Sequence, residues 1–361
     1  LDVPVQEEKA EEQKFQAVSL ALTQRLIEPV LSRVGSSKNW IVSPDGSLWA
    51  INWAALWIRD GRAPRNGHYF VEDHRFVNYV VSTRDLIRTW PTVQTTPPLI
   101  MADPDYDLGV AEARQISQSL STRAAAPTTH PSTRAMIGLK PVSPLPDTRR
   151  EALKVAESLQ HYANAQPRIR LGKDAVEAEF KNVHSPKLVY LTTHGFFFPL
   201  QELGVDESTY QAGTSPLENP LLRCGLTLAS CNRREPRAPD DDDGYLTGME
   251  IAGTDLRGTE LAVLSACETG LGDVWAGQSA AGLRQAFELA GAKTVVASLW
   301  SVPEVETTDL LSGFISNLSL RKPKGEALAT SEINLLQSRL QKRQTAHPFY
   351  WAGFTLTGQW Q

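Results

Sequence analysis

Hydrophobic residues near the start of the chain recur at the spacing of an α-helix. They lie three to four positions apart and so share one helical face: Phe15, Val18, Leu22, Leu26, Val30 and Val34. We therefore expect a helix over residues 15–34, which Pro29 kinks or ends. Residues 1–38 are assigned to an N-terminal linker and helix.

Residues 39–95 show a different pattern, with short runs rich in β-branched and aromatic residues. Turn signals separate these runs, namely Pro44-Asp45-Gly46, Asp60-Gly61 and Asn66-Gly67. The pattern predicts a small antiparallel β meander subdomain. Its aromatic residues are expected to fill a thin core: Trp40, Trp49, Trp53, Trp57, Tyr69 and Tyr79.

Residues 96–361 alternate apolar strands with helical stripes, and we assign them to one domain. Buried strands are expected over 99–102, 187–193, 261–266 and 294–300. Thr148 and Glu151 have the spacing of a capping box at the start of a helix, as do Thr247 and Glu250. This alternation is typical of an α/β fold with a mostly parallel sheet and helices on both faces.

Composition excludes several classes of function. The chain has 361 residues with a net charge of −5, so no basic excess exists to bind nucleic acid. No apolar run approaches the length of about 20 residues that crosses a membrane. Three cysteines without a pairing pattern fit a reducing compartment, and we expect a cytoplasmic protein. The polar start at Leu1 is no signal peptide, so we expect upstream domains in a longer protein.

Two reactive side chains follow buried strands. His194 comes after the run KLVYLTT, and Cys267 comes after LAVLSA. Parallel strands end at one edge of a sheet, so both side chains are expected on one rim. An imidazole there can accept the proton of a thiol and later deliver it to a leaving amine. Taken alone, a strand-end histidine is more often a hydrogen-bonded structural residue, and a buried cysteine is usually part of the packing.

The wider sequence resembles the CHAT domain family of caspase-like, separase-related cysteine peptidases. The resemblance spans residues 40–361 and rests on ordered blocks: VYLTTHGFF, NPLLRCGLTLA, GYLTGMEIAGTDLRGTELAVLSACETGLG, LRQAFELAGAKTVVASLWSV and HPFYWAGFTLTG. It implies a caspase-like fold with His194 as general base and acid and Cys267 as nucleophile. It also implies that the backbone N–H groups of Gly195 and Cys267 form the oxyanion hole.

The same resemblance suggests where substrate specificity resides. Metacaspase relatives carry an acid two positions before the cysteine, but Ser265 stands there in this chain. Thr192 is expected to line the pocket, Asp103 to place a carboxylate at its floor, and Glu304 to present an acid to the substrate. Trp300 and Ser301 correspond to the block that aligns the substrate backbone as an added strand. A pocket acid favours cleavage after Arg or Lys. For Asp103 and Glu304, a turn residue and a first-turn helix carboxylate are the alternatives.

Neither a metal nor a cofactor is expected. Asp240 to Asp243 end a long irregular insertion over 203–244, and calcium-dependent relatives invite a calcium site there. No EF-hand spacing supports a calcium site. We therefore interpret these aspartates as a solvated acidic loop, with a mobile activation segment as the alternative.

Two functions from different classes follow. The first is a cysteine endopeptidase that cleaves a specific protein substrate in bacterial-type signalling or defence. We expect upstream TPR-like repeats, another regulatory domain or an activator protein to control it. The second is a catalytically silent scaffold that keeps the fold and binds partner proteins. Intact His194 and Cys267 favour the first.

Overall fold

The computed structural model describes most of the chain, in two compact units. The described residues are 5–34, 36–61, 63, 65–120, 141–197, 219–238, 241–266, 276–342 and 344–361. One unit comprises residues 1–88 and 301–361, and the other comprises residues 89–300. The first unit thus combines the segment expected to be a separate meander with the C-terminal elements.

The first unit contains a small parallel sheet and an antiparallel pair. Its strands are β1 (Asn39–Val42), β2 (Trp57–Arg59), β3 (Gly67–Tyr69), β4 (Phe76–Tyr79) and β13 (Phe354–Gly358). Strands β2 and β3 are antiparallel, as predicted, whereas β4 runs parallel to both β1 and β13. Short 3-10 turns lie at Gly46–Ala50, Trp53–Ala55, Phe70–Asp73, Thr83–Leu86 and Pro348–Tyr350.

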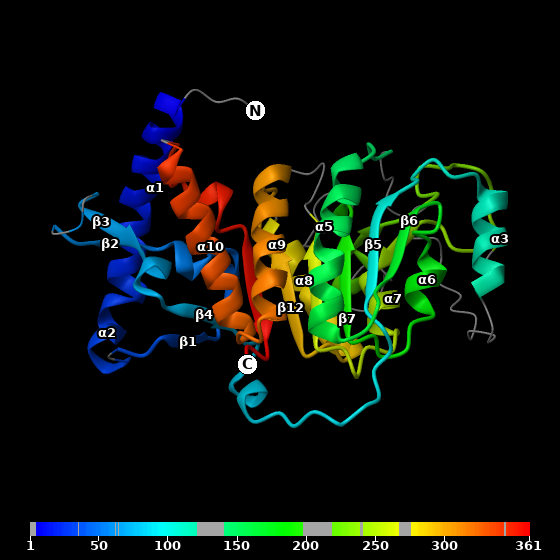
Figure 1. The fold of residues 1–361 in the computed structure, drawn as a ribbon, viewed down its shortest axis with the longest axis horizontal. Helices are drawn as coiled ribbons and strands as arrows, with labels where there is room; N and C mark the ends of the chain where they lie inside the picture. The colour runs from blue at the N-terminus through cyan, green and yellow to red at the C-terminus, as the bar shows by residue number, and fades with distance from the viewer. Residues whose placement is uncertain are drawn as a thin grey trace, which may run out of the picture. The chain divides into compact units, whose positions relative to one another are not determined.

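Four helices accompany these strands (Figure 1): α1 (Val5–Leu26), α2 (Glu28–Val34), α9 (Glu304–Ser319) and α10 (Lys324–Gln341). The break between α1 and α2 lies two residues before Pro29, which confirms the interruption predicted there. Trp40, Trp57 and Tyr69 are buried, so these aromatic residues serve the core, as expected.

The second unit is built on five parallel strands in the order β12-β11-β7-β5-β6. These are β5 (Leu99–Pro104), β6 (Arg168–Gly172), β7 (Leu188–Thr192), β11 (Leu261–Ser265) and β12 (Thr294–Ser298). Their carboxyl ends therefore share one edge, which we call the rim. A second, antiparallel sheet has the order β10-β9-β8, from β8 (Gly195–Phe197), β9 (Cys224–Thr227) and β10 (Tyr245–Thr247).

Helices pack on both faces of the five-stranded sheet (Figure 1), as predicted: α5 (Pro146–Ala163) on one face, and α6 (Glu177–Lys181), α7 (Gly248–Ala252) and α8 (Ala276–Ala290) on the other. Helix α3 (Val110–Leu120) packs against α6, and a 3-10 turn lies at Pro220–Leu222. Helix α5 contacts β5 and β7, and Glu151 accepts a 2.7 Å hydrogen bond from the Tyr190 hydroxyl on that face. Val189 and Leu191 alternate to the other face, where they join the main core cluster.

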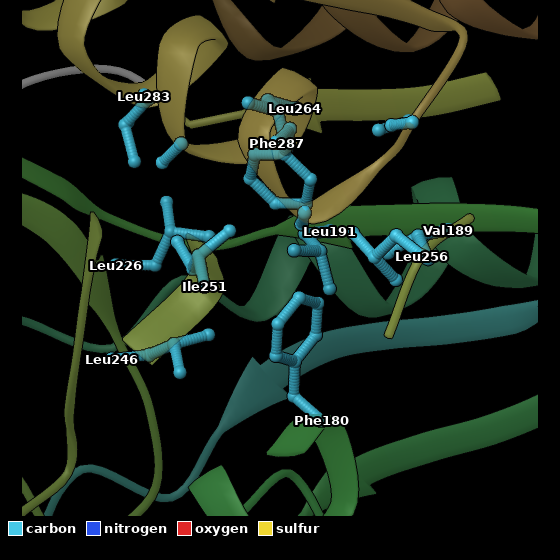
Figure 2. Packing of buried hydrophobic residues seen from close by; sticks show 14 of the residues in the cluster. Phe180, Val189, Leu191, Leu226, Leu246, Ile251, Leu256, Leu264, Leu283 and Phe287 are labelled. Atoms are coloured by element: carbon cyan, nitrogen blue, oxygen red, sulfur yellow. The ribbon is translucent and has the colours of Figure 1, made fainter. Parts of the chain in front are cut away.

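This core cluster connects the sheet to α6, α7 and α8. Figure 2 shows Phe180 on one side of Leu191 and Phe287 of α8 on the other, with Leu264 nearby. The rings of Phe180 and Phe287 lie 5.9 Å apart in an edge-to-face arrangement. The packing fixes β7 and β11 side by side and thereby positions the rim. In the described parts of the chain, no helix has the length and apolar character to cross a bilayer.

One predicted capping box is present and the other is wrong. The Thr247 hydroxyl accepts a hydrogen bond from the Glu250 N–H, and the Glu250 carboxylate accepts one from the Thr247 N–H. Helix α5 instead begins at Pro146, and its Glu151 is engaged by Tyr190. The buried phenol offers this carboxylate a partner across the core, so Glu151 does not cap the helix.

Candidate active site

His194 lies at the rim, two residues after β7 ends. Its side chain is buried, and its Nε2 atom is 2.7 Å from the Ser143 carbonyl oxygen. A carbonyl can only accept a hydrogen bond, so Nε2 carries the proton in the neutral ring and Nδ1 keeps the lone pair. The arrangement therefore assigns Nδ1 as the basic atom of this histidine.

The pKa of His194 lies below the ordinary value for histidine. Burial lowers it by disfavouring the charged ring, and the hydrogen bond to Ser143 offsets part of that effect. At neutral pH the imidazole is uncharged, which is the state a general base needs.

A chain of hydroxyl groups fixes the backbone beside this ring. The Thr193 hydroxyl donates to the Thr227 carbonyl at 2.6 Å, so the Tyr106 hydroxyl, 2.9 Å away, donates to Thr193. Burial raises the pKa of Tyr106 to about 12, which keeps its proton in place. The Tyr106 ring packs on the His194 ring with centroids 5.5 Å apart. Tyr106 thus shields and orients the imidazole.

Removing this shield should change how His194 titrates. We expect Tyr106→Ala to raise the pKa of His194 towards the ordinary value of about 6.5, because water then reaches the ring. Tyr106→Phe keeps the ring contact and should leave the titration nearly unchanged. NMR titration of the His194 ring measures both. An unaltered pKa in the alanine variant would show that Tyr106 does not control hydration of His194.

Backbone around Gly195 and Ala266 brings the two strand ends together. Ser265 of β11 is paired in register with Thr192 of β7. A Cβ added to Gly195 would lie 3.7 Å from the Ala266 carbonyl oxygen, so these two residues are in contact range. The Ser298 hydroxyl, at the end of β12, donates to that same oxygen at 3.0 Å. Cys267 itself lies outside the described residues, and its approach to His194 stays a prediction.

The residues predicted to set specificity have different environments. Thr192 is fully buried, and its hydroxyl has no hydrogen-bond partner among the described residues. Ser265 is buried beside it. Asp103 follows Ala102, which pairs with Thr192, and its carboxylate is engaged by Arg149. Trp300 ends the second unit, whereas Ser301 and Glu304 belong to the first, where both are exposed and Glu304 begins α9.

The acidic segment is held by cationic side chains of the chain itself. Arg114 donates to Asp241 at 2.9 Å, and Lys181 lies 2.5 Å from Asp242. The prediction of a solvated acidic loop is thus wrong for Asp241 and Asp242, because ion pairs with Arg114 and Lys181 hold both carboxylates in partly buried positions. Asp240 lies outside the described residues. No group of metal-ligating side chains occurs within the residues that the structure describes.

Sequence reasoning missed three contributors to this site. Ser143 binds His194 through its backbone carbonyl, which every residue has. The residue type at position 143 therefore could not have indicated this role. Ser298 and Tyr106 are ordinary residues for a strand end and a loop. Ser298 falls inside the strand predicted over 294–300, so its position in the pattern offers no signal.

The geometry can be compared with known proteins. The family model of the CHAT domain matches residues 16–359. Tetratricopeptide repeat protein 28 of Mus musculus is 37% identical over 105 residues, which are 29% of this chain and 4% of that protein. The crystal structure of the Arg-specific cysteine proteinase gingipain R (RGPB) has a TM-score of 0.43 and 8% identity, covering 80% of this chain and 55% of that one. The family match covers nearly the whole sequence, so the chain belongs to the CHAT domain family.

Proposed function

We propose that this chain is a cysteine endopeptidase in which His194 and Cys267 form the catalytic dyad. The observation that carries the proposal is the buried, neutral imidazole at the rim, held through Nε2 by Ser143. Its strand β7 pairs in register with β11, from which the chain runs through Ala266 to Cys267. Membership of a family that resembles caspase-like peptidases supports the same conclusion.

The reaction proceeds in two steps. Nδ1 of His194 accepts the thiol proton as Cys267 attacks the peptide carbonyl, and the resulting imidazolium protonates the departing amine. Backbone N–H groups of Gly195 and Cys267 stabilise the oxyanion. Water, deprotonated by the same imidazole, then hydrolyses the thioester and releases the free thiol. The Tyr106 ring limits hydration of the base throughout the cycle.

The substrate is proposed to be a specific protein cut after Arg or Lys. Asp103 is the acid that supports this choice, because it lies at the rim on the strand next to β7. Thr192 and Ser265 line the adjoining part of the pocket, and Trp300 aligns the substrate backbone. The roles expected of Ser301 and Glu304, which belong to the first unit, stay predictions. Cys224 and Cys231 are buried thiols that form no disulfide within the described residues, which suits the cytoplasmic location that we propose.

Control by other domains is part of the proposal. The chain spans only 4% of the TPR-containing relative that it matches. We infer that this peptidase works within, or beside, a protein with helical repeats, whose binding of a signal shifts the site towards its active state.

Covalent labelling at Cys267 tests the proposal. A peptide electrophile ending in Arg should modify Cys267 selectively, and Cys267→Ala should abolish both labelling and cleavage. Cys224→Ala and Cys231→Ala are matched controls, since both thiols are buried, and each should leave labelling intact. Cleavage that survives Cys267→Ala would overturn the dyad. Absence of labelling with any peptide, even beside an activating partner, would favour a silent scaffold.

A further inference from the structure

Asp103, the proposed pocket acid, sits in a distorted turn at the end of β5. Its φ of +47° lies in the left-handed region, and the register between β5 and β6 shifts between Ala102 and Pro104. The Asp103 N–H donates to the Thr148 hydroxyl at 2.9 Å, which ties the turn to the first turn of α5. These contacts hold the carboxylate of Asp103 at the rim.

The carboxylate already has an internal cation. Arg149 donates from Nε to Oδ2 of Asp103 at 2.8 Å, with Arg149 50% and Asp103 19% exposed. A Cβ on Gly172 would lie 3.7 Å from Nη2 of Arg149, so the guanidinium extends over the end of β6. This ion pair uses Oδ2 of the carboxylate, and the Arg149 side chain stays half exposed to solvent.

We propose that Arg149 competes with the substrate for Asp103 and thereby limits the preference for a basic residue before the scissile bond. The inference rests on the proposed function, because it assigns Asp103 to the substrate pocket. Without substrate, Arg149 neutralises the acid. A substrate arginine that reaches Asp103 meets a carboxylate already paired, so it must displace Arg149 or bind beside a like charge.

The relative strengths of the two contacts make this exchange feasible. Ion pairs that face solvent contribute little, since water screens them and the long side chain loses freedom. A substrate guanidinium shielded by a bound peptide can engage a carboxylate through two parallel hydrogen bonds, which is the stronger geometry. Arg149 therefore weakens recognition of basic substrates without preventing it.

Arg149 and the catalytic base His194 are both held by the same segment of chain. Ser143, whose carbonyl accepts from His194, precedes Thr148 and Arg149 by only a few residues along the segment 142–149. Asn232 holds the same segment by bonds to both the N–H and the carbonyl of Val142, at 2.8 Å and 2.9 Å. Displacement of Arg149 thus takes place within the segment that orients the imidazole.

Equilibrium binding to a chain that cannot cut tests the proposal. The full chain carrying Cys267→Ala is titrated with acetyl-Ala-Ala-Ala-Arg amide and with its citrulline counterpart, which has the same shape without the charge. We expect Arg149→Ala to raise the arginine-to-citrulline affinity ratio about two- to fivefold, the worth of an exposed ion pair. Asp103→Asn should bring the ratio close to one.

Arg150→Ala is the matched control, because Arg150 is the next residue of the helix and pairs with Asp147 at 2.7 Å instead. It removes the same charge and should leave the ratio unchanged. If the arginine-to-citrulline affinity ratio is the same in Arg149→Ala as in Arg150→Ala, the proposal that Arg149 competes for Asp103 is wrong. The proposal is also wrong if the preference for the arginine peptide persists in Asp103→Asn, or if neither the arginine nor the citrulline peptide binds.

The outcomes separate this inference from the proposed function. Cleavage by the unsubstituted chain together with an unmoved ratio in Arg149→Ala rejects the competitor and leaves the peptidase standing. A ratio that depends on Asp103 and Arg149, in a chain that never cleaves a peptide, supports the competitor and rejects the peptidase.

Discussion

Replacement of His194 by alanine is expected to lower kcat/KM for peptide cleavage by about 10²- to 10⁴-fold, the usual contribution of a positioned acid–base group. The loss should fall mainly on kcat, since the imidazole acts on protons and contributes little to substrate binding. Fluorogenic peptide cleavage measures both constants. The exposed His184 offers a control, because His184→Ala removes the same side chain away from the rim and should keep full activity.

The pH dependence provides a second check on the same residue. The base works only when neutral, and its pKa lies below the ordinary value because the ring is buried. Activity governed by His194 should therefore rise with pH, and the midpoint of this acidic limb should lie below about pH 6.5, where an ordinary histidine is half protonated. An acidic limb centred above that pH would contradict the buried, neutral base. Full activity of His194→Ala at any pH would reject the dyad.

The parts of the fold that were predictable share a clear physical origin. Strands β7, β11 and β12 are continuous apolar runs, because both faces of a parallel sheet are covered. His194 could be placed at the rim because parallel strands end on a common edge. These inferences use local patterns of ten residues or fewer and the geometry of the sheet.

The features that escaped prediction depend on contacts distant in sequence. Strands β8, β9 and β10 have three or four residues each, too few to show periodicity, and β9 lies within the segment 203–244 that was expected to be irregular. Strand β4 joins β13, hundreds of residues later, so no local pattern could reveal a parallel pairing. The support of His194 by Ser143 involves a backbone carbonyl.

The buried cationic centre at Lys181 is the second place where one substitution should have a large effect. Its Nζ atom lies 3.1 Å from Glu177, 2.5 Å from Asp242 and 3.2 Å from Glu250. Burial alone would lower the pKa of Lys181, but the three carboxylates outweigh it and raise the pKa. This cluster joins α6 and α7 to the segment leading into β10, whose sheet includes Gly195 at β8.

Lys181→Met is expected to lower the free energy of unfolding by about 3 kcal/mol, the lower end for breaking a buried ion pair, because Asp242 and Glu250 are partly exposed. Denaturant unfolding followed by fluorescence measures the change. Lys173→Met is the control: Lys173 pairs with Glu112 at 3.1 Å in solvent and should alter stability by less than about 1 kcal/mol.

The pH dependence of this defect has a defined sign. Burial raises the pKa of Glu177 well above its ordinary value, and Lys181 opposes that rise. Without Lys181 the pKa in the folded state climbs further, so the folded state holds more protons than the unfolded state and loses stability as pH increases. The deficit of Lys181→Met should thus be largest above neutrality and shrink towards pH 5.

A double variant separates lost charge balance from lost packing. Glu177→Gln in the Lys181→Met background removes the most deeply buried carboxylate, and its amide oxygen can still accept from the Gly244 N–H that Glu177 binds at 2.5 Å. Stability should recover by at least half, because one fewer anion remains uncompensated. A double variant as unstable as Lys181→Met, or one whose deficit is independent of pH, would mean that the methylene stem of Lys181 matters more than its charge.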